Sequence, residues 1–138
     1  MTTLTTALKD LVAGCVGITA IIGTAPMRYY PIRLPQPPIV YPAITYQRID
    51  APGVYSHSGY SSVRDPRIQL TIWATSYNTC DLLEEAINAI TPVGLNGFKG
   101  IQSTVQIDRL FINEGIADFD PVTQTHQRVI DLMISYVG

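Results

Sequence analysis

Residues 67–90 read RIQLTIWATSYNTCDLLEEAINAI, and this stretch decides the fold class. Apolar and polar side chains alternate from Arg67 to Thr75, which predicts a strand with one buried face. From Ser76 to Ile90 the apolar residues recur at helical spacing, and Pro92 ends the pattern. The apolar stripe of this helix consists of Leu82, Leu83, Ala86, Ile87 and Ile90. A strand that leads into an amphipathic helix predicts a domain that contains both kinds of element.

Further strands are expected on both sides of this stretch. Ala43–Asp50 alternates in the same way as the first strand, so the two are expected to form a hairpin. The segment between them, Ala51–Asp65, is rich in Gly, Ser and Tyr and is expected to be a long loop. Downstream, strands are expected over Ile101–Asn113 and His126–Val137, with a second long loop over Glu114–Thr125.

The N-terminal third is expected to be helical and then extended. Leucines on one face predict a helix over Thr3–Ala13, and a second short turn is expected over Ile18–Ile22. Six prolines exclude a regular helix over Pro26–Pro42, which is expected to form an ordered extended arm. The whole order predicts an α+β fold: an antiparallel four-stranded sheet with two main helices on one face, the Pro-rich arm and two long loops. A length of 138 residues argues for a single domain, 1–138.

The charge content limits the kinds of partner. Charged residues make up only 14% of the chain, so few charges must lose water when a partner binds. Nine basic and eleven acidic residues give a net charge of −2, and Lys9 and Lys99 are the only lysines. Proteins that bind nucleic acid need clustered lysine and arginine, and the basic residues of this chain are few and scattered. Direct DNA binding is therefore disfavoured. DNA that passes nearby without specific binding remains allowed. The apolar run Val16–Ile22 is too short to span a bilayer, so no membrane partner is expected.

No motif in the sequence has the spacing of a catalytic, metal or cofactor site. Cys15 and Cys80 belong to no CxxC or Cys/His ligand pattern, and they are expected either as reduced thiols or as a disulfide. Gly94–Gly100 is glycine-rich, but it follows a helix and precedes a strand, which is the reverse of a phosphate-binding loop. His57 and His126 lie in polar, loop-like sequence, without a nucleophile motif. We therefore predict that the chain is not an enzyme and uses no cofactor and no metal.

The two long loops contain the candidate interaction residues. Tyr55, Tyr60 and Arg64 in the first loop and Phe119 in the second are candidates for a protein interface, because aromatic and arginine side chains are enriched at interface centres. The alternative is that these rings fold back onto their own loops.

Acidic residues of the second loop suggest a different role. Glu114, Asp118 and Asp120 lie in this loop, and no basic residue follows them until Arg128. Such an acidic loop would repel DNA and let it slide. These three residues are candidates for the lining of a DNA channel. A solvated hairpin tip and, for Asp118-Phe119-Asp120, a divalent-ion site are the alternatives; hard cations need more oxygen ligands than this motif supplies.

Three stretches, in chain order, resemble the tail-completion (tail-terminator) proteins of long-tailed bacteriophages and prophages. The first stretch contains Met27-Arg28-Tyr29-Tyr30-Pro31, Leu34-Pro35-Gln36 and Tyr41-Pro42-Ala43-Ile44-Thr45-Tyr46-Gln47. The second is Arg67-Ile68-Gln69-Leu70-Thr71-Ile72-Trp73-Ala74, followed by Tyr77 and a helix. The third is Asp120-Pro121 with Gln127-Arg128-Val129-Ile130-Asp131-Leu132. Pro37 and Pro38 depart from the family pattern and leave the path of the Pro-rich arm open.

The resemblance implies a virion protein of the neck-proximal end of the tail, assembled in the host cytoplasm. Such proteins form a hexameric ring on the tail tube, end tube growth and present a docking face to the head connector or neck protein. The expected partners are therefore further copies of the chain, the tail tube protein and the connector, with DNA passing through. The family has no catalytic residues. The alternatives are another head–tail joining or minor tail protein and, in a different class, a small hydrolase that uses Cys or His.

Overall fold

The computed structural model describes residues 4–23, 27–35, 39–50, 53–56, 59–64, 67–91, 93–102, 105–122 and 124–137, with the backbone alone at 50, 53–56, 59–64, 114, 115 and 137. In these residues the helices are α1 (Leu4–Ala13), α2 (Val16–Ile22) and α3 (Tyr77–Asn88). The strands are β1 (Tyr29–Pro31), β2 (Ala43–Asp50), β3 (Gly53–Ser56), β4 (Gly59–Arg64), β5 (Arg67–Ala74), β6 (Gly100–Gln102), β7 (Val105–Asp120) and β8 (Thr125–Val137).

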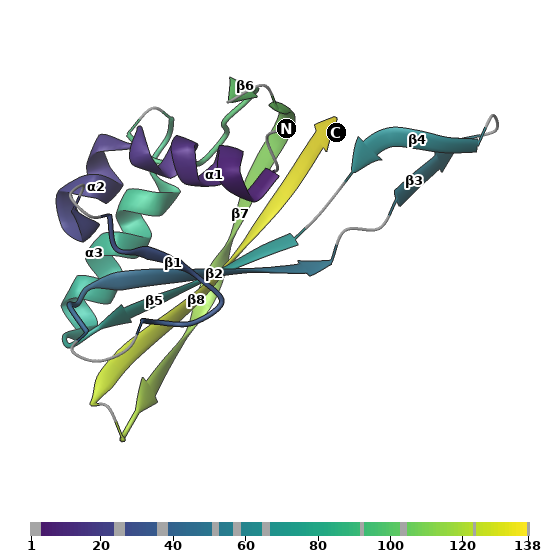
Figure 1. The fold of residues 1–138 in the computed structure, drawn as a ribbon. Helices are drawn as coiled ribbons and strands as arrows, with labels where there is room; N and C mark the ends of the chain where they lie inside the picture. Colours follow the sequence, from purple (N-terminus) through teal and green to yellow (C-terminus); the bar gives the residue numbers. More distant parts are fainter. Residues whose placement is uncertain are drawn as a thin grey trace.

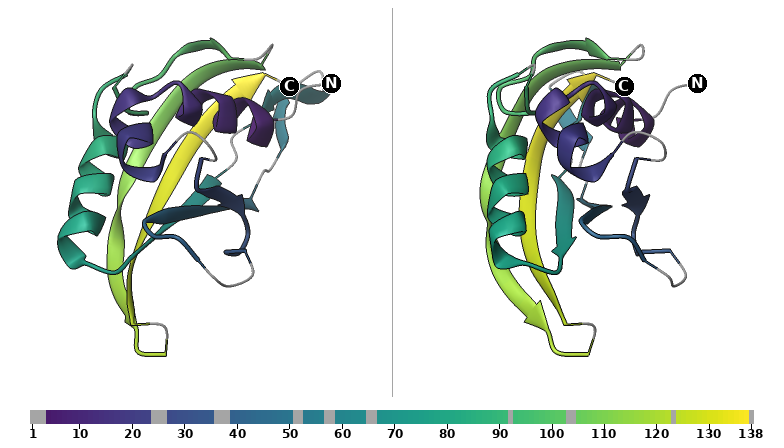
Figure 2. Two further views of the ribbon diagram at one scale, coloured as in Figure 1. Left: turned by 60° about the vertical axis from the view of Figure 1, so that its left-hand side comes forward. Right: turned by 90° about the vertical axis from the view of Figure 1, so that its left-hand side faces the viewer.

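The described strands form one mixed, strongly curved sheet of eight strands. β1 pairs with β2 in parallel, and the other pairs are antiparallel. β8 is central, because it pairs with β5 and β4 along one side and with β7 along the other. The three helices lie together on one face of the sheet (Figure 1; Figure 2).

The core lies between the helices and this face. In β5 every second side chain is buried, and the buried ones are Ile68, Leu70, Ile72 and Ala74. β8 repeats this alternation with Ile130, Leu132 and Ile134. The helices add their apolar stripes, which include Leu4, Leu8 and Leu11 of α1 and Leu83 and Ile87 of α3. The alternation predicted from the sequence for β5 and β8 and the leucine stripe of α1 are therefore confirmed. The stripe predicted for α3 is confirmed at Leu83 and Ile87, but it is wrong at Leu82, which is 50% exposed, and at Ile90, which is 75% exposed and lies beyond the end of the helix.

Two hairpins give the molecule its outline. The strand pairs β2–β5 and β3–β4 follow one another in nearly continuous register, with Asp50 opposite Arg67 and Gly53 opposite Arg64. They form one long ribbon whose outer half, β3–β4, projects away from the body (Figure 1). The second hairpin is β7–β8, whose strands are 16 and 13 residues long and are joined by a short turn.

The expected four-stranded antiparallel sheet is wrong, and the two long loops are the main reason. The segment expected as a loop over Ala51–Asp65 contains β3 and β4, and the one over Glu114–Thr125 is largely the ends of β7 and β8. Glu114-Gly115 has the composition of a turn, but it forms a bulge between Asn113 and Ile116 within one strand. The expected strand over Ile101–Asn113 divides into β6 and the first part of β7.

The Pro-rich segment supplies the parallel strand that makes the sheet mixed. Tyr29 to Pro31 pair with Ile44 to Tyr46 at the sheet edge, where a proline without an N–H is tolerated. Arg28 holds the segment in place: its Nε donates to the carbonyl of Pro42 at 2.7 Å and its Nη2 to the carbonyl of Ile21 at 2.9 Å. Pro37 and Pro38 lie outside the described residues.

Candidate functional site

The face of the sheet opposite the helices is the first candidate site. Leu110 of β7 and Ile134 of β8 are register partners and are buried toward the helices. Their chain neighbours Phe111 and Met133, also register partners, therefore lie on the opposite face. Phe111 is 54% exposed and Met133 is 40% exposed. In the described part of the chain no helix covers this face (Figure 2).

A hollow of about 580 Å³ lies on this outer face, around Phe111 and Met133. We call it the outer-face hollow; its lining residues are Arg109, Phe111, Ile112, Asn113, Met133, Ile134 and Ser135. The guanidinium carbon of Arg109 lies 5.7 Å from the centre of the Phe111 ring, within the range of a cation–π contact. An apolar floor with one stacked arginine fits an aromatic or small polar segment of a protein better than a charged ligand.

The projecting β3–β4 hairpin is the second candidate. From here on we call this hairpin the arm; it is distinct from the Pro-rich segment. It joins the sheet only where Val63 pairs with Val137 and Arg64 with Tyr136. Beyond that point its described strands pair only with each other, and Tyr55 lies opposite Tyr60. A two-stranded ribbon of this kind is marginally stable in water unless something packs against it.

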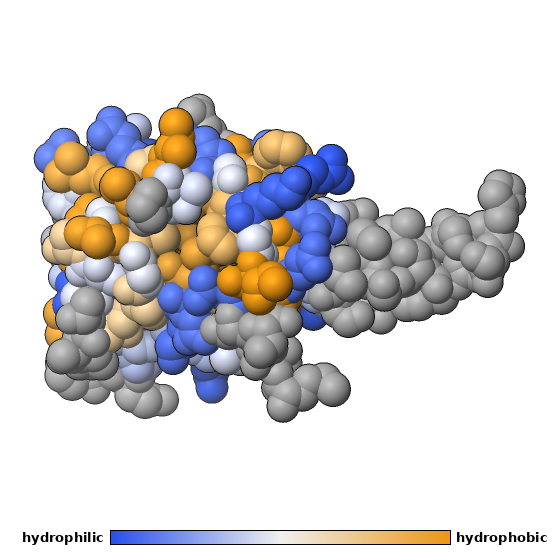
Figure 3. Space-filling model, turned by 90° about the horizontal axis from the view of Figure 1, so that it is seen from above, coloured by the Kyte–Doolittle hydropathy of each residue, from blue (hydrophilic) through white to orange (hydrophobic). Residues whose placement is uncertain are grey.

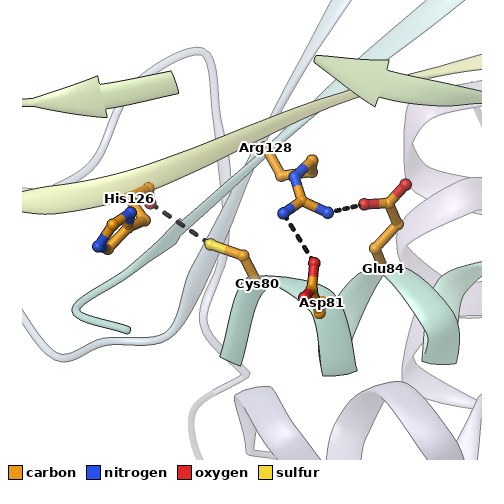
Figure 4. Close-up of polar contacts among 5 residues, drawn as sticks. All are labelled: Cys80, Asp81, Glu84, His126 and Arg128. Carbon is orange, nitrogen blue, oxygen red and sulfur yellow. Dashed lines mark hydrogen bonds and ion pairs between the residues drawn. The ribbon is translucent and has the colours of Figure 1, made fainter. Parts of the chain in front are cut away.

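A cluster of charges lies between α3 and β8 and connects the two elements (Figure 4). Arg128 of β8 is buried and donates from Nη2 to Asp81 at 2.8 Å and from Nη1 to Glu84. Its guanidinium carbon also lies 5.0 Å from the centre of the Tyr77 ring. Burial on its own lowers the pKa of Arg128, but the hydrogen bonds and charges of Glu84 and Asp81 outweigh it and raise the pKa. The guanidinium therefore stays charged, and the cluster fastens α3 to the sheet.

Neither cysteine has the surroundings of a nucleophile. The Cys80 thiol points to the main-chain carbonyl of His126 at 3.6 Å, not to its ring, and burial raises its pKa (Figure 4). The Cys15 thiol donates to the carbonyls of Leu11 and Gly94, and burial raises its pKa to about 11. Reactive thiols need lowered pKa values, so this geometry gives no support to the Cys/His hydrolase alternative. Both cysteines are free and buried, which answers the question of a disulfide between them.

The glycine-rich segment is a turn, as the sequence predicts. Gly94 is buried against α3, where the carbonyls of Ala86 and Ala89 leave no room for a Cβ atom. The amide of Asn96 donates to the carbonyl of Ala89 at 3.1 Å, which closes the chain back onto the helix end. The amides of this segment are thus used within the fold and do not form a phosphate cradle.

The sequence matches no protein-family model and no curated protein. The fold, in contrast, matches that of a chain of known structure. A chain in a solved structure described as the virion of a native gene transfer agent particle superimposes with a TM-score of 0.73 and 16% sequence identity. The match covers 98% of this chain and 95% of that chain, so the two share a fold over almost their entire lengths.

The residues predicted as interface residues fall into two separate places in the fold. Tyr55, Tyr60 and Arg64 belong to the arm, where the backbone alone is described. Phe119 lies near the β7–β8 tip; the residue is 42% exposed, and the centre of its ring lies 4.9 Å from the centre of the His126 ring. That contact agrees with the alternative in which Phe119 packs on its own hairpin, while its exposed part leaves an interface role as a prediction.

The acidic candidates lie on the β7–β8 hairpin and its turn. Asp118 accepts from the amide of Phe119 at 2.7 Å, and Asp120 accepts from the amide of Val122 at 2.9 Å. Both carboxylates thus help to shape the tip, and both remain accessible to solvent. Glu114 lies at the bulge, and its side chain is outside the described part. Within the described ranges no group of three His, Cys, Asp or Glu residues has the arrangement of a metal site.

The outer-face hollow and the Arg128 cluster were not predicted from the sequence. The second could have been found, because Arg128 has the same parity in β8 as the apolar residues Ile130, Leu132 and Ile134. An arginine on the buried face of a strand needs an acidic partner from the element that packs there.

Other surfaces are more ordinary. Seen from above, hydrophobic and hydrophilic residues are interspersed over the helical end of the molecule (Figure 3). Val16, Val93 and Ile101 are exposed apolar residues in this part of the chain. Among the described helices none is by itself long and apolar enough to cross a membrane; α1 and α2 meet that measure only as a pair, with an 85° bend between them.

Proposed function

We propose that this chain is a structural subunit of a phage-like particle and forms the ring that ends the tail tube. The observation that carries the proposal is the match in fold, over 98% of the chain, to a chain of a gene transfer agent virion. The sequence resemblance to tail-terminator proteins supports a position at the neck-proximal end of the tail. Six copies, a tail tube protein on one face and a head connector on the other are the expected arrangement.

The surface chemistry supports an assembly role. A charge content of 14% means that contacts between copies require little desolvation of charge. The arm and the uncovered sheet face lie on one chain and differ from each other, so a contact between them would be heterologous. Heterologous contacts generate closed rings when the rotation between neighbours closes.

The test is assembly of the purified protein, measured by light scattering and negative-stain electron microscopy with and without the tail tube protein. We expect rings of about six subunits, or a ring that forms when tube is added. A chain that stays monomeric at high concentration under both conditions would overturn the proposal. Rings that bind the connector but leave tube length unregulated would favour the alternative of a head–tail joining protein.

A further inference from the structure

Beyond its base, where Val63 and Arg64 pair with β8, the arm has no strand partner among the described residues of its own chain. Its described strands extend beyond the sheet, away from the body that carries the outer-face hollow (Figure 1). A two-stranded ribbon buries too little surface to be stable alone. The fold therefore leaves the arm dependent on a surface that another molecule supplies.

The outer-face hollow has the complementary property. Phe111 and Met133 keep about half of their side-chain surface exposed on a sheet face where the described chain places no helix. Large apolar side chains that are grouped around a hollow mark an interaction site more often than scattered ones do. Arg109 is the one charged residue among the described lining residues, and it already stacks on Phe111.

The chemistry of the two surfaces matches. Residues 53–63 read GVYSHSGYSSV and contain no Lys, Arg, Asp or Glu; Arg64, the last residue of the arm, lies at its base, where it pairs with Tyr136 of β8. An uncharged segment with two tyrosines can enter an apolar hollow without burying an unpaired charge. The guanidinium of an arginine beside an aromatic ring favours contact with further aromatic rings. A negatively charged ligand would form an ion pair with Arg109 there, but it would lose its hydration where it contacts the apolar floor of the hollow.

We propose that the arm of one copy seats in the outer-face hollow of the next copy around the ring. The arm points away from its own body, so the hollow that it fills belongs to a neighbour. Donor and acceptor are different surfaces of one chain, which makes the contact head-to-tail. This inference rests on the proposed ring and specifies which surfaces join its subunits.

Cysteine cross-linking in assembled rings tests the contact directly. Met133→Cys is combined in turn with Tyr55→Cys, Ser58→Cys or Tyr60→Cys, and the rings are oxidised and run on a denaturing gel. Cys15 and Cys80 are buried and remain in place. The control combines each arm cysteine with Glu85→Cys, which is exposed on α3 at the helical side of the sheet. We expect a ladder of linked subunits with Met133→Cys and little linkage with Glu85→Cys.

A second variant pair tests the apolar contact. Phe111→Ser is expected to raise the concentration needed for ring formation at least 10-fold, and Phe111→Leu should restore most of the assembly. The matched control is Ile116→Ser, because Ile116 is 77% exposed on β7 outside the hollow lining. Melting temperatures of all three variants report whether the fold is intact. Rings that form without a Met133 ladder, together with normal assembly of Phe111→Ser, would overturn the arm contact and leave the ring proposal standing. Failure of the unmodified chain to form rings both with and without the tail tube protein would overturn both.

Discussion

Arg128 of β8 and Asp81 of α3 are joined by a hydrogen-bonded ion pair of 2.8 Å, and Glu84 one turn further along α3 completes the cluster. The arginine side chain is 8% exposed, the Glu84 side chain 17% and the Asp81 side chain 44%. These exposed fractions predict how much free energy of unfolding is lost when each member of the cluster is replaced. The more buried a charge is, the more its lost partner matters.

We predict that Arg128→Met lowers the free energy of unfolding by about 3 kcal/mol, because it leaves the Glu84 carboxylate buried without its partner. Asp81→Asn should cost less than about 1 kcal/mol, since Asp81 is nearly half exposed and water screens its charge. Urea denaturation measures both. Equal losses for the two variants would contradict the order given by burial. The raised pKa of Arg128 keeps its contribution present at every pH below its unfolded value, so the arginine itself adds no acid dependence.

Gly94→Ala is predicted to destabilise the fold by about 2–3 kcal/mol, because overpacked sites must displace backbone. An added Cβ atom would lie 2.5 Å from the carbonyl oxygen of Ala89 and too close to that of Ala86. Gly14→Ala is the matched control, since its nearest atom would be 3.5 Å away. Thermal denaturation should separate the two variants clearly, and similar melting temperatures would argue against the close packing of this turn on α3.

The elements that the sequence predicts are those whose pattern is local. The alternation of β5, the leucine stripe of α1 and the extended character of the Pro-rich segment follow from residue order alone. The arm could not be predicted in the same way, because glycine is a poor strand former and only the pairing of 53–56 with 59–64 makes a ribbon. Composition reports intrinsic preference, and here the pairing of two neighbouring strands overrides it.

The outer-face hollow depends on register, which the sequence does not contain. Ile107 and Leu110 are both buried, three positions apart, because a register shift between Ile107 and Arg109 moves one residue of β7 out of alternation. A shift of one residue moves every later side chain to the other face of a strand. That shift puts Phe111 on the outer face opposite Met133, so a strict alternation from Ile101 would have misplaced it.

Stability is predicted to fall at alkaline pH because of Cys15. Its folded pKa of about 11 lies above the ordinary cysteine pKa of 9.0, so the folded state holds the thiol proton more tightly. This contribution is fully present below pH 9.0 and is lost as the pH rises toward about 11. Cys15→Ala should flatten the decline over this window, measured as the urea midpoint against pH. An unchanged slope would show that another group is responsible.

Ile32→Asn is predicted to stabilise the fold by about 1 kcal/mol, because a β-branched residue with a positive φ is strained. Ile32 has a φ of 65° and is 71% exposed, so its side chain gains little in exchange. Asparagine tolerates this conformation, and the hydrogen bond from the residue-32 amide to the carbonyl of Tyr46 at 2.8 Å is kept. Val40→Asn is the control, because Val40 is 61% exposed and is not among the described residues with a positive φ. Loss of ring assembly by Ile32→Asn with a raised melting temperature would indicate that the strain is retained for a contact.

The last prediction concerns the carboxylates at the β7–β8 tip. If Asp118 and Asp120 line the channel of the ring, their negative charge repels the DNA phosphates and keeps DNA from adhering. Basic side chains at these positions would instead neutralise phosphates and hold the duplex in place. Substitution by Lys should then leave ring formation normal and slow DNA ejection from complete particles. Both carboxylates also accept amide hydrogen bonds in the tip, at 2.7 Å and 2.9 Å, so shape and charge must be separated.

Asp118→Asn and Asp120→Asn separate shape from charge, because an amide oxygen still accepts the same hydrogen bonds after the charge is removed. For a channel position, ejection should slow progressively from Asp to Asn to Lys, and the effect of Lys should weaken at high salt as phosphate contacts do. Glu85→Lys on α3 reverses one charge on the opposite side of the sheet and should leave ejection unchanged. Unaltered ejection kinetics in assembled particles with Lys at both positions would place the tip outside the DNA path.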